Sequence, residues 1–144
     1  MNSLELKQEA IVISEYCFAI QRILATVNEL SLIKLYTFTY IYNKNSFNKW
    51  SIYSGLDTSD VVYKCLSCMS GLFDDYCKNL KYIIYALDLL IKSDFVVLKD
   101  GYISKTDNNV EKPTSVYYTN LIKAVSESVI FTDAQFLKEV IRNV

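Results

Sequence analysis

The chain has 144 residues, the length of one domain and enough to bury a core without disulfides or metal ions. Its 15 basic and 16 acidic residues give a formal net charge of −1, so it lacks the basic surplus of a dedicated DNA-binding domain. It contains no His, no run of about eighteen apolar residues, and no GxGxxG or GxxxxGK[ST] motif. The sequence therefore argues against His-dependent catalysis, a membrane span and the common phosphate-binding loops.

The amino-terminal sequence MNSLELKQEA mixes charged and apolar side chains and does not read as a secretory signal. We therefore expect the four Cys to be free thiols of a cytoplasmic protein. Only 3 Gly and 1 Pro occur, which favours long helices over a turn-rich β fold. We expect a mainly α fold in a single domain covering residues 1–144.

The first predicted helix spans about residues 4–27. Apolar residues recur at spacings of three and four from Leu6 to Val27, and a second stripe containing Tyr16 and Ile23 lies beside the first. So wide an apolar face either enters the protein's own core or is shared with another chain. In the second interpretation, Tyr16, Ile20 and Ile23 are candidate anchors for a protein partner.

The next stretch, LSLIKLYTFTYIY at about residues 30–42, is apolar on nearly all sides. Its alternation between residues 36 and 40 also fits a strand, but a run of this length without a breaker favours a buried helix. A polar connection over residues 43–58 then contains Trp50, the only Trp. This side chain either pins the connection to the core or acts as a binding anchor.

A further helix is predicted from a cap at residues 58–60 to about Met69, with an interruption at Ser70 and Gly71. Asp74 and Asp75 then begin a helix that runs to about residue 92. Its predicted inward stripe consists of Leu80, Ile83, Leu87, Leu90 and Ile91. The carboxylate pairs at 57/60 and 74/75 resemble magnesium ligands, but each falls at a helix start, where capping and the helix dipole explain it better.

The segments FVVLK and YISKT flank Asp100-Gly101, which predicts a β-hairpin with a tight turn. After a polar linker, helices are predicted over about 114–130 and 133–143. Thr132 and Gln135 have the spacing of a capping box at the start of the last helix. Its apolar stripe includes Phe136 and Val140, two further candidate anchors.

Cys65 and Cys68 form a CxxC motif, with Cys77 nine residues later. A zinc site needs four ligands near tetrahedral geometry, and the chain offers neither His nor a second CxxC. The motif also lies in a predicted helix, so small buried thiols explain it better. We predict no metal, no cofactor and no catalytic residues.

The order helix, Gly, helix, hairpin is typical of a winged helix, here at about residues 28–106 with a carboxy-terminal helical extension at about 114–143. Within it, the helix before the hairpin would read DNA and the hairpin would be the wing. Candidate DNA-contacting residues are Lys78, Lys81, Lys99 and Lys105. Several Asp in the same segment oppose phosphate binding, and winged helices also serve as protein adaptors.

The order of three segments resembles that of the small middle component of ABC-three-component systems, including the Lamassu type of bacterial anti-phage defence. These segments are the first helix, then LSLIKLYTFTYIY, then YALDLLIKSDFVVLKDGYISKT. The resemblance covers about residues 1–106. It implies a subunit that bridges an SMC-like ATPase and an effector, often a nuclease, in a complex that senses foreign DNA. ATP hydrolysis and cutting would then belong to the partners.

The sequence thus predicts a non-enzymatic adaptor with protein partners and no membrane association. The main alternative is a dimeric winged-helix transcription regulator, whose binding to duplex DNA would depend on salt. A small phage or viral protein that binds a host protein is a third interpretation.

Overall fold

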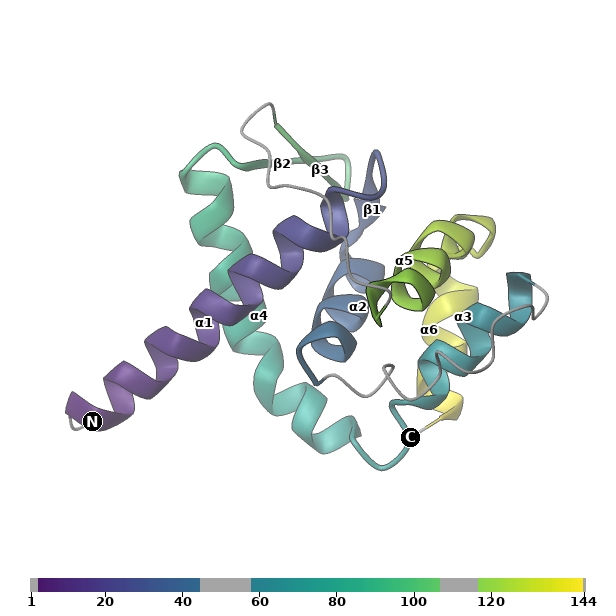
Figure 1. Ribbon diagram of the computed structural model, residues 1–144, viewed down its shortest axis with the longest axis horizontal. Coiled ribbons are helices and arrows are strands. Elements are labelled where there is room, and N and C mark those ends of the chain that lie inside the picture. Colours follow the sequence, from purple (N-terminus) through teal and green to yellow (C-terminus); the bar gives the residue numbers. More distant parts are fainter. Residues whose placement is uncertain (1–2, 45–57, 107–116, 144) are drawn as a thin grey trace.

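The computed structural model describes residues 3–44, 58–106 and 117–143. They form a mainly helical fold with a small antiparallel sheet, as predicted (Figure 1). The elements occur in the order α1 (Ser3–Leu24), β1 (Leu30–Ser31), α2 (Leu32–Lys44), α3 (Thr58–Ser67), α4 (Phe73–Lys92), β2 (Val96–Lys99), β3 (Tyr102–Lys105), α5 (Tyr117–Glu127), the 3-10 helix η2 (Ser128–Ile130) and α6 (Asp133–Arg142).

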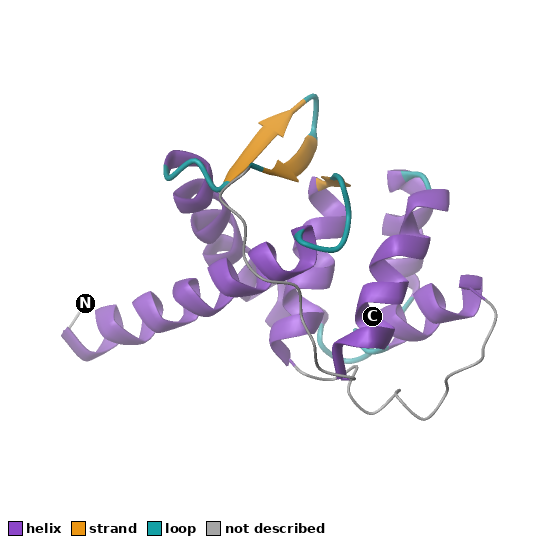
Figure 2. Ribbon diagram, turned by 45° about the horizontal axis from the view of Figure 1, so that its top comes forward, coloured by secondary structure: helices purple, strands orange, loops and turns teal. Residues whose placement is uncertain are grey.

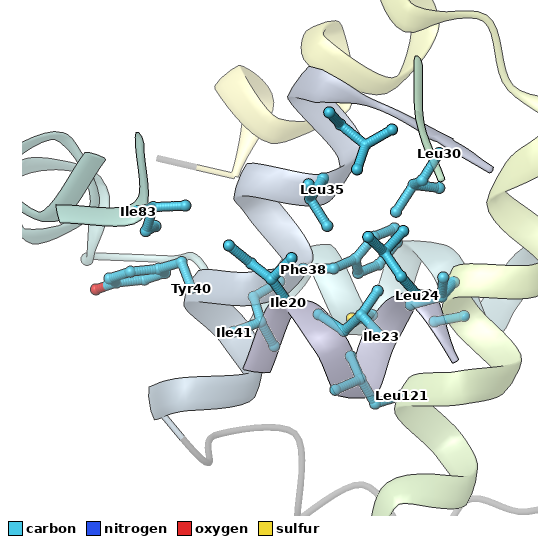
Figure 3. Close-up of a cluster of buried hydrophobic side chains, with 14 of the residues drawn as sticks. Ile20, Ile23, Leu24, Leu30, Leu35, Phe38, Tyr40, Ile41, Ile83 and Leu121 are labelled. Atoms are coloured by element: carbon cyan, nitrogen blue, oxygen red, sulfur yellow. The ribbon is translucent and has the colours of Figure 1, made fainter. Parts of the chain in front are cut away.

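Helix α2 lies at the centre of the molecule, and the prediction of a buried helix for this stretch is confirmed. It contacts α1 and α4 on one side and α5 and α6 on another. Figure 3 shows its Leu35, Phe38 and Ile41 among side chains from α1 and α5. A helix surrounded in this way needs apolar residues around most of its circumference, which is what the sequence provides.

Helices α1 and α4 cross each other beside α2 (Figure 1). At the crossing, the Tyr16 hydroxyl donates a hydrogen bond to Asn79 Oδ1 over 3.0 Å. The first turns of α1 extend beyond α4, so that Leu4 and Leu6 are exposed although Leu6 continues the inward stripe. The helix is therefore longer than the core that it covers.

Helices α3, α5 and α6 form a second group against α2 (Figure 1). The rings of Phe38 on α2 and Phe136 on α6 join this group to the centre, with centroids 5.4 Å apart. Within the described part of the helix predicted over about 114–130, the chain forms α5 and then η2. At the start of η2, the Ser128 hydroxyl donates to the Val125 carbonyl over 2.6 Å.

The sheet has the strand order β1-β3-β2, and both pairs are antiparallel. Figure 2 shows it lying across one end of the helices. The predicted hairpin is confirmed, and its turn residues Asp100 and Gly101 have φ values of 54° and 82°. Strand β1 was not predicted. Its Leu30 pairs with Ile103, and both side chains are buried, so this pair ties the hairpin to the core.

The ends of α4 determine how the chain enters and leaves it. Gly71 has a φ of 76°, which accounts for the predicted interruption between α3 and α4. At the other end, Asp94 has a φ of 62°, and the Phe95 N–H donates to the Leu90 carbonyl. A left-handed residue with this bond closes the helix in a Schellman-type turn and directs the chain into β2.

Candidate functional site

Five of the side chains predicted as anchors for a partner are buried in the protein's own core. Tyr16, Ile20 and Ile23 on α1, with Phe136 and Val140 on α6, are each at most 3 % exposed. These side chains are not available to another chain in this fold, so we correct that prediction. Helix α1 packs against α2 and α4, and α6 packs against α2 and α3. The remaining predicted anchor, Trp50, lies outside the described residues.

Tyr16 lies on the part of α1 that the core encloses. Burial raises the pKa of its hydroxyl to about 12, and the nearby carboxylates Asp75 and Glu15 act in the same direction. The hydrogen bond to Asn79 satisfies the hydroxyl at the crossing of α1 and α4. A buried phenol with a partner inside the chain is a structural residue and not a contact surface.

The side of α4 that faces solvent carries large apolar residues. The exposed fractions of Ile84, Tyr85 and Leu89 are 45, 56 and 50 %. The predicted inward stripe is confirmed at Ile83, which is buried, and at its neighbours Leu87 and Leu90. Ile84, Tyr85 and Leu89 are apolar residues of the same helix that lie outside that stripe. Their position outside the stripe is the sequence signal that could have identified them.

The β2–β3 hairpin that follows α4 also exposes apolar side chains. Val97 and Leu98 on β2 are each nearly half exposed. Because Val97 pairs with Ser104 and Lys99 pairs with Tyr102, these four residues share the face of the hairpin opposite buried Ile103. Leu98 pairs with Ile103 and therefore lies on the other face of the hairpin. We call Ile84, Tyr85, Leu89 and Val97 the α4–hairpin surface.

The four lysines proposed to contact DNA are all exposed. Lys78 and Lys81 lie on α4, and Lys99 and Lys105 lie on the hairpin. Lys81 Nζ lies 4.9 Å from the centre of a neighbouring aromatic ring, that of Tyr82. The structure thus places two of these lysines at exposed positions of α4 and two at exposed positions of the hairpin strands.

Acidic residues occupy the same helix. Lys92 Nζ lies 2.8 Å from an Asp88 carboxylate oxygen. Lys44 Nζ lies 2.7 Å from Asp75 Oδ2, to which the Tyr40 hydroxyl also donates. These two bonds lower the pKa of Asp75, and burial opposes them. Asp75 therefore joins α2 to α4, in place of the magnesium site considered for the 74/75 pair.

The cysteines are not gathered into one site. Cys65 is buried on α3 and Cys77 is exposed on α4, while Cys68 is half-buried and its thiol faces the Lys64 carbonyl at 3.7 Å. Across residues 3–44, 58–106 and 117–143, no three His, Cys, Asp or Glu side chains are placed to hold a metal ion. Burial raises the pKa of Cys65 well above its ordinary value, which disfavours the reactive thiolate.

A cleft of about 370 Å³ lies between the sheet and the segment that joins α5 to α6. One side is lined by Glu29 just before β1, by Ser31 of β1 and by Lys34 of α2. Tyr102 lines the cleft from β3, and residues 129–133 form the opposite wall. Its volume is at the lower end of the range of ligand pockets. No sequence pattern indicated this cleft, because it depends on the pairing of β1 with β3 and on the position of α6.

The polar groups of the cleft bond to one another. Lys34 is only 7 % exposed, and its ammonium donates to the Phe131 carbonyl over 2.6 Å. Burial lowers the pKa of Lys34, and the charge of Asp133 opposes that shift. Asp133 Oδ1 accepts a hydrogen bond of 2.6 Å from the Ser31 hydroxyl. The ammonium and one carboxylate oxygen are thus held in place by the chain itself.

None of the protein-family models, curated proteins or solved structures compared with this chain matches it. Within the part of the chain that the structure describes, no helix combines the length and apolar character needed to cross a membrane. The candidate functional features of the described residues are therefore the α4–hairpin surface, the exposed lysines and the cleft.

Proposed function

We propose that this chain is a non-catalytic adaptor subunit that binds a protein partner through its α4–hairpin surface. The observation that carries the proposal is the exposure of Ile84, Tyr85 and Leu89 on one helix. Exposed apolar side chains that gather on one element mark interaction sites, and Tyr is enriched in protein interfaces. A partner that covers these residues would remove from water the apolar area that α4 leaves exposed.

The topology supports a winged-helix-like description of this adaptor. The sheet order β1-β3-β2, with a helix directly before the hairpin, is the arrangement expected of a helix and its wing. In DNA-reading members of that class, the helix enters the major groove and bonds to base edges. Ile84 and Leu89 have no hydrogen-bonding groups with which to read bases, although both lie on the open side of α4.

The resemblance of residues 1–106 to the middle component of ABC-three-component systems extends the proposal to specific partners. In such a complex the chain would bridge an SMC-like ATPase and an effector such as a nuclease, in DNA-sensing defence against phage. The resemblance alone supports this part of the proposal.

The test is co-expression of the full chain with the products of its neighbouring genes, followed by light scattering of the purified material. We expect a hetero-complex that Leu89→Asp disrupts. Ile141→Asp is the matched control, because Ile141 is similarly exposed but lies on α6. Far-UV circular dichroism of each variant alone establishes that it is folded. A complex that survives both Leu89→Asp and Tyr85→Asp would refute the proposed surface.

The second candidate function is a dimeric winged-helix regulator that binds duplex DNA. The observation in its favour is the exposure of all four lysines on α4 and the hairpin. It predicts that Lys78→Glu and Lys81→Glu each weaken DNA binding, and that affinity falls steeply as salt is raised. Binding that neither substitution changes would exclude this use of α4.

A further inference from the structure

The cleft between β1, β3 and the η2–α6 segment contains carboxylate oxygens that can accept more hydrogen bonds than the chain itself supplies. Three charged residues line it, Glu29, Lys34 and Asp133, so two carboxylates face one ammonium and the net charge is −1. The ammonium is buried and bonded to the Phe131 carbonyl. The acceptors are less fully used, because the described hydrogen bond of Asp133 engages only Oδ1 and a carboxylate has about four acceptor positions.

An anionic ligand does not fit this arrangement. The amino-terminal end of α6 attracts negative charge, but Asp133 already occupies the first residue of that helix. The capping box of Thr132 and Gln135 further satisfies N–H groups of the helix start. A phosphate or carboxylate entering here would meet Asp133 and Glu29 without gaining a free ammonium.

The rim of the cleft suits a long side chain with an apolar stem. Val129 and Ile130 are 64 and 63 % exposed, and Tyr102 presents a partly exposed ring across the cleft. The stems of Lys and Arg pack on such surfaces while their charged ends stay polar. Arg is favoured over Lys because its planar guanidinium bonds two carboxylate oxygens at once and stacks on aromatic rings.

We propose that this cleft binds an arginine side chain of a partner polypeptide. The guanidinium donates to Glu29 and to the second oxygen of Asp133, and the stem lies on Val129 and Ile130. This contact is separate from the α4–hairpin surface and does not depend on which protein that surface binds. It adds a second point of recognition, with a defined chemical requirement for one basic residue.

The test uses the full ¹⁵N-labelled chain and the blocked pentapeptide Gly-Leu-Arg-Leu-Gly, followed by amide chemical shifts. The comparison peptides carry citrulline or Glu in place of Arg. We expect the Arg peptide to shift amides lining the cleft and the neutral citrulline peptide to bind about five- to tenfold more weakly, because a charge-assisted bond is lost. Equal binding of the Arg and citrulline peptides, tighter binding of the Glu peptide, or shifts only outside the cleft would each overturn the proposal.

Variants of the chain locate the contact. Asp133→Asn removes one charge but keeps an oxygen acceptor for Ser31. Glu29→Gln removes the other charge, at a residue outside any helix. We expect each substitution to weaken binding of the Arg peptide about threefold or more. Asp88→Asn on α4 is the matched control and should bind as the unchanged chain does. Leu89→Asp should also leave peptide binding intact, so failure of the α4–hairpin surface and failure of the cleft are distinguishable. Unchanged affinity in both cleft variants would refute the assignment.

Discussion

Replacement of Phe136 by Ala separates a core role from an interface role for α6. The Phe136 side chain is fully buried and packs on Phe38 with ring centroids 5.4 Å apart. Truncation of a buried Phe to Ala costs about 3–5 kcal/mol, of which the ring pair accounts for about 0.5–1.5 kcal/mol. Domains have about 5–15 kcal/mol of stability in total, so we expect Phe136→Ala to lose about a fifth of it or more.

The assay is urea unfolding followed by far-UV circular dichroism. With a slope of about 1–3 kcal/mol per molar urea, the expected loss lowers the midpoint by about 1 M or more. Leu137→Ala is the matched control, since the neighbouring side chain is 41 % exposed, and it should cost less than about 1 kcal/mol. If Phe136→Ala costs no more than Leu137→Ala and instead abolishes binding to a partner, the assignment of Phe136 to the core is wrong.

Three further substitutions test local features of the fold. Thr132→Ala removes the side-chain acceptor of the α6 cap and should cost about 1 kcal/mol in urea unfolding, and a change below about 0.3 kcal/mol would contradict the cap. Gly101→Ala places a Cβ at a φ of 82° with open space around it, so the expected loss of about 1–2 kcal/mol in thermal unfolding is purely conformational. Lys44 and Tyr40 lower the pKa of Asp75 in the folded chain. The ionised carboxylate therefore stabilises the fold at pH values above its pKa in the unfolded chain, and this stabilisation is lost as the pH falls through its pKa in the folded chain. Between about pH 5 and about pH 3 the unchanged chain should therefore lose more stability than Asp75→Asn, and parallel losses would contradict the ion pair.

Features set by neighbouring residues were predictable from the sequence. Asp100-Gly101 predicts a hairpin because both residues tolerate positive φ, and both adopt it. Thr132 and Gln135 predict a capping box because the two side chains reach each other's backbone N–H groups across one turn, and both bonds are present. In each case the determining interactions lie within a few residues.

Features set by contacts distant in the sequence were not predictable in the same way. Strand β1 has only two residues, Leu30 and Ser31, which is too short for a period-two pattern, and it exists because β3 pairs with it. The stripe on α1 correctly indicated a wide buried face, but periodicity does not show what covers that face. The structure shows that α4 and α2 pack on α1, and that the outward side of α4 exposes Ile84, Tyr85 and Leu89 among charged residues instead.

The charges on α4 make salt the condition that best separates the two candidate functions. The helix carries equal numbers of acidic and basic residues, namely Asp74, Asp75, Asp88, Lys78, Lys81 and Lys92. If four lysines of α4 and the hairpin nevertheless contacted phosphates, affinity for DNA would fall by about 10²-fold or more between about 0.1 M and about 0.5 M salt. A complex held by Ile84, Tyr85 and Leu89 should persist over the same range, because burial of apolar surface is not screened. A protein complex that dissociates as steeply as this would show that charge, and not the apolar side of α4, holds the partner.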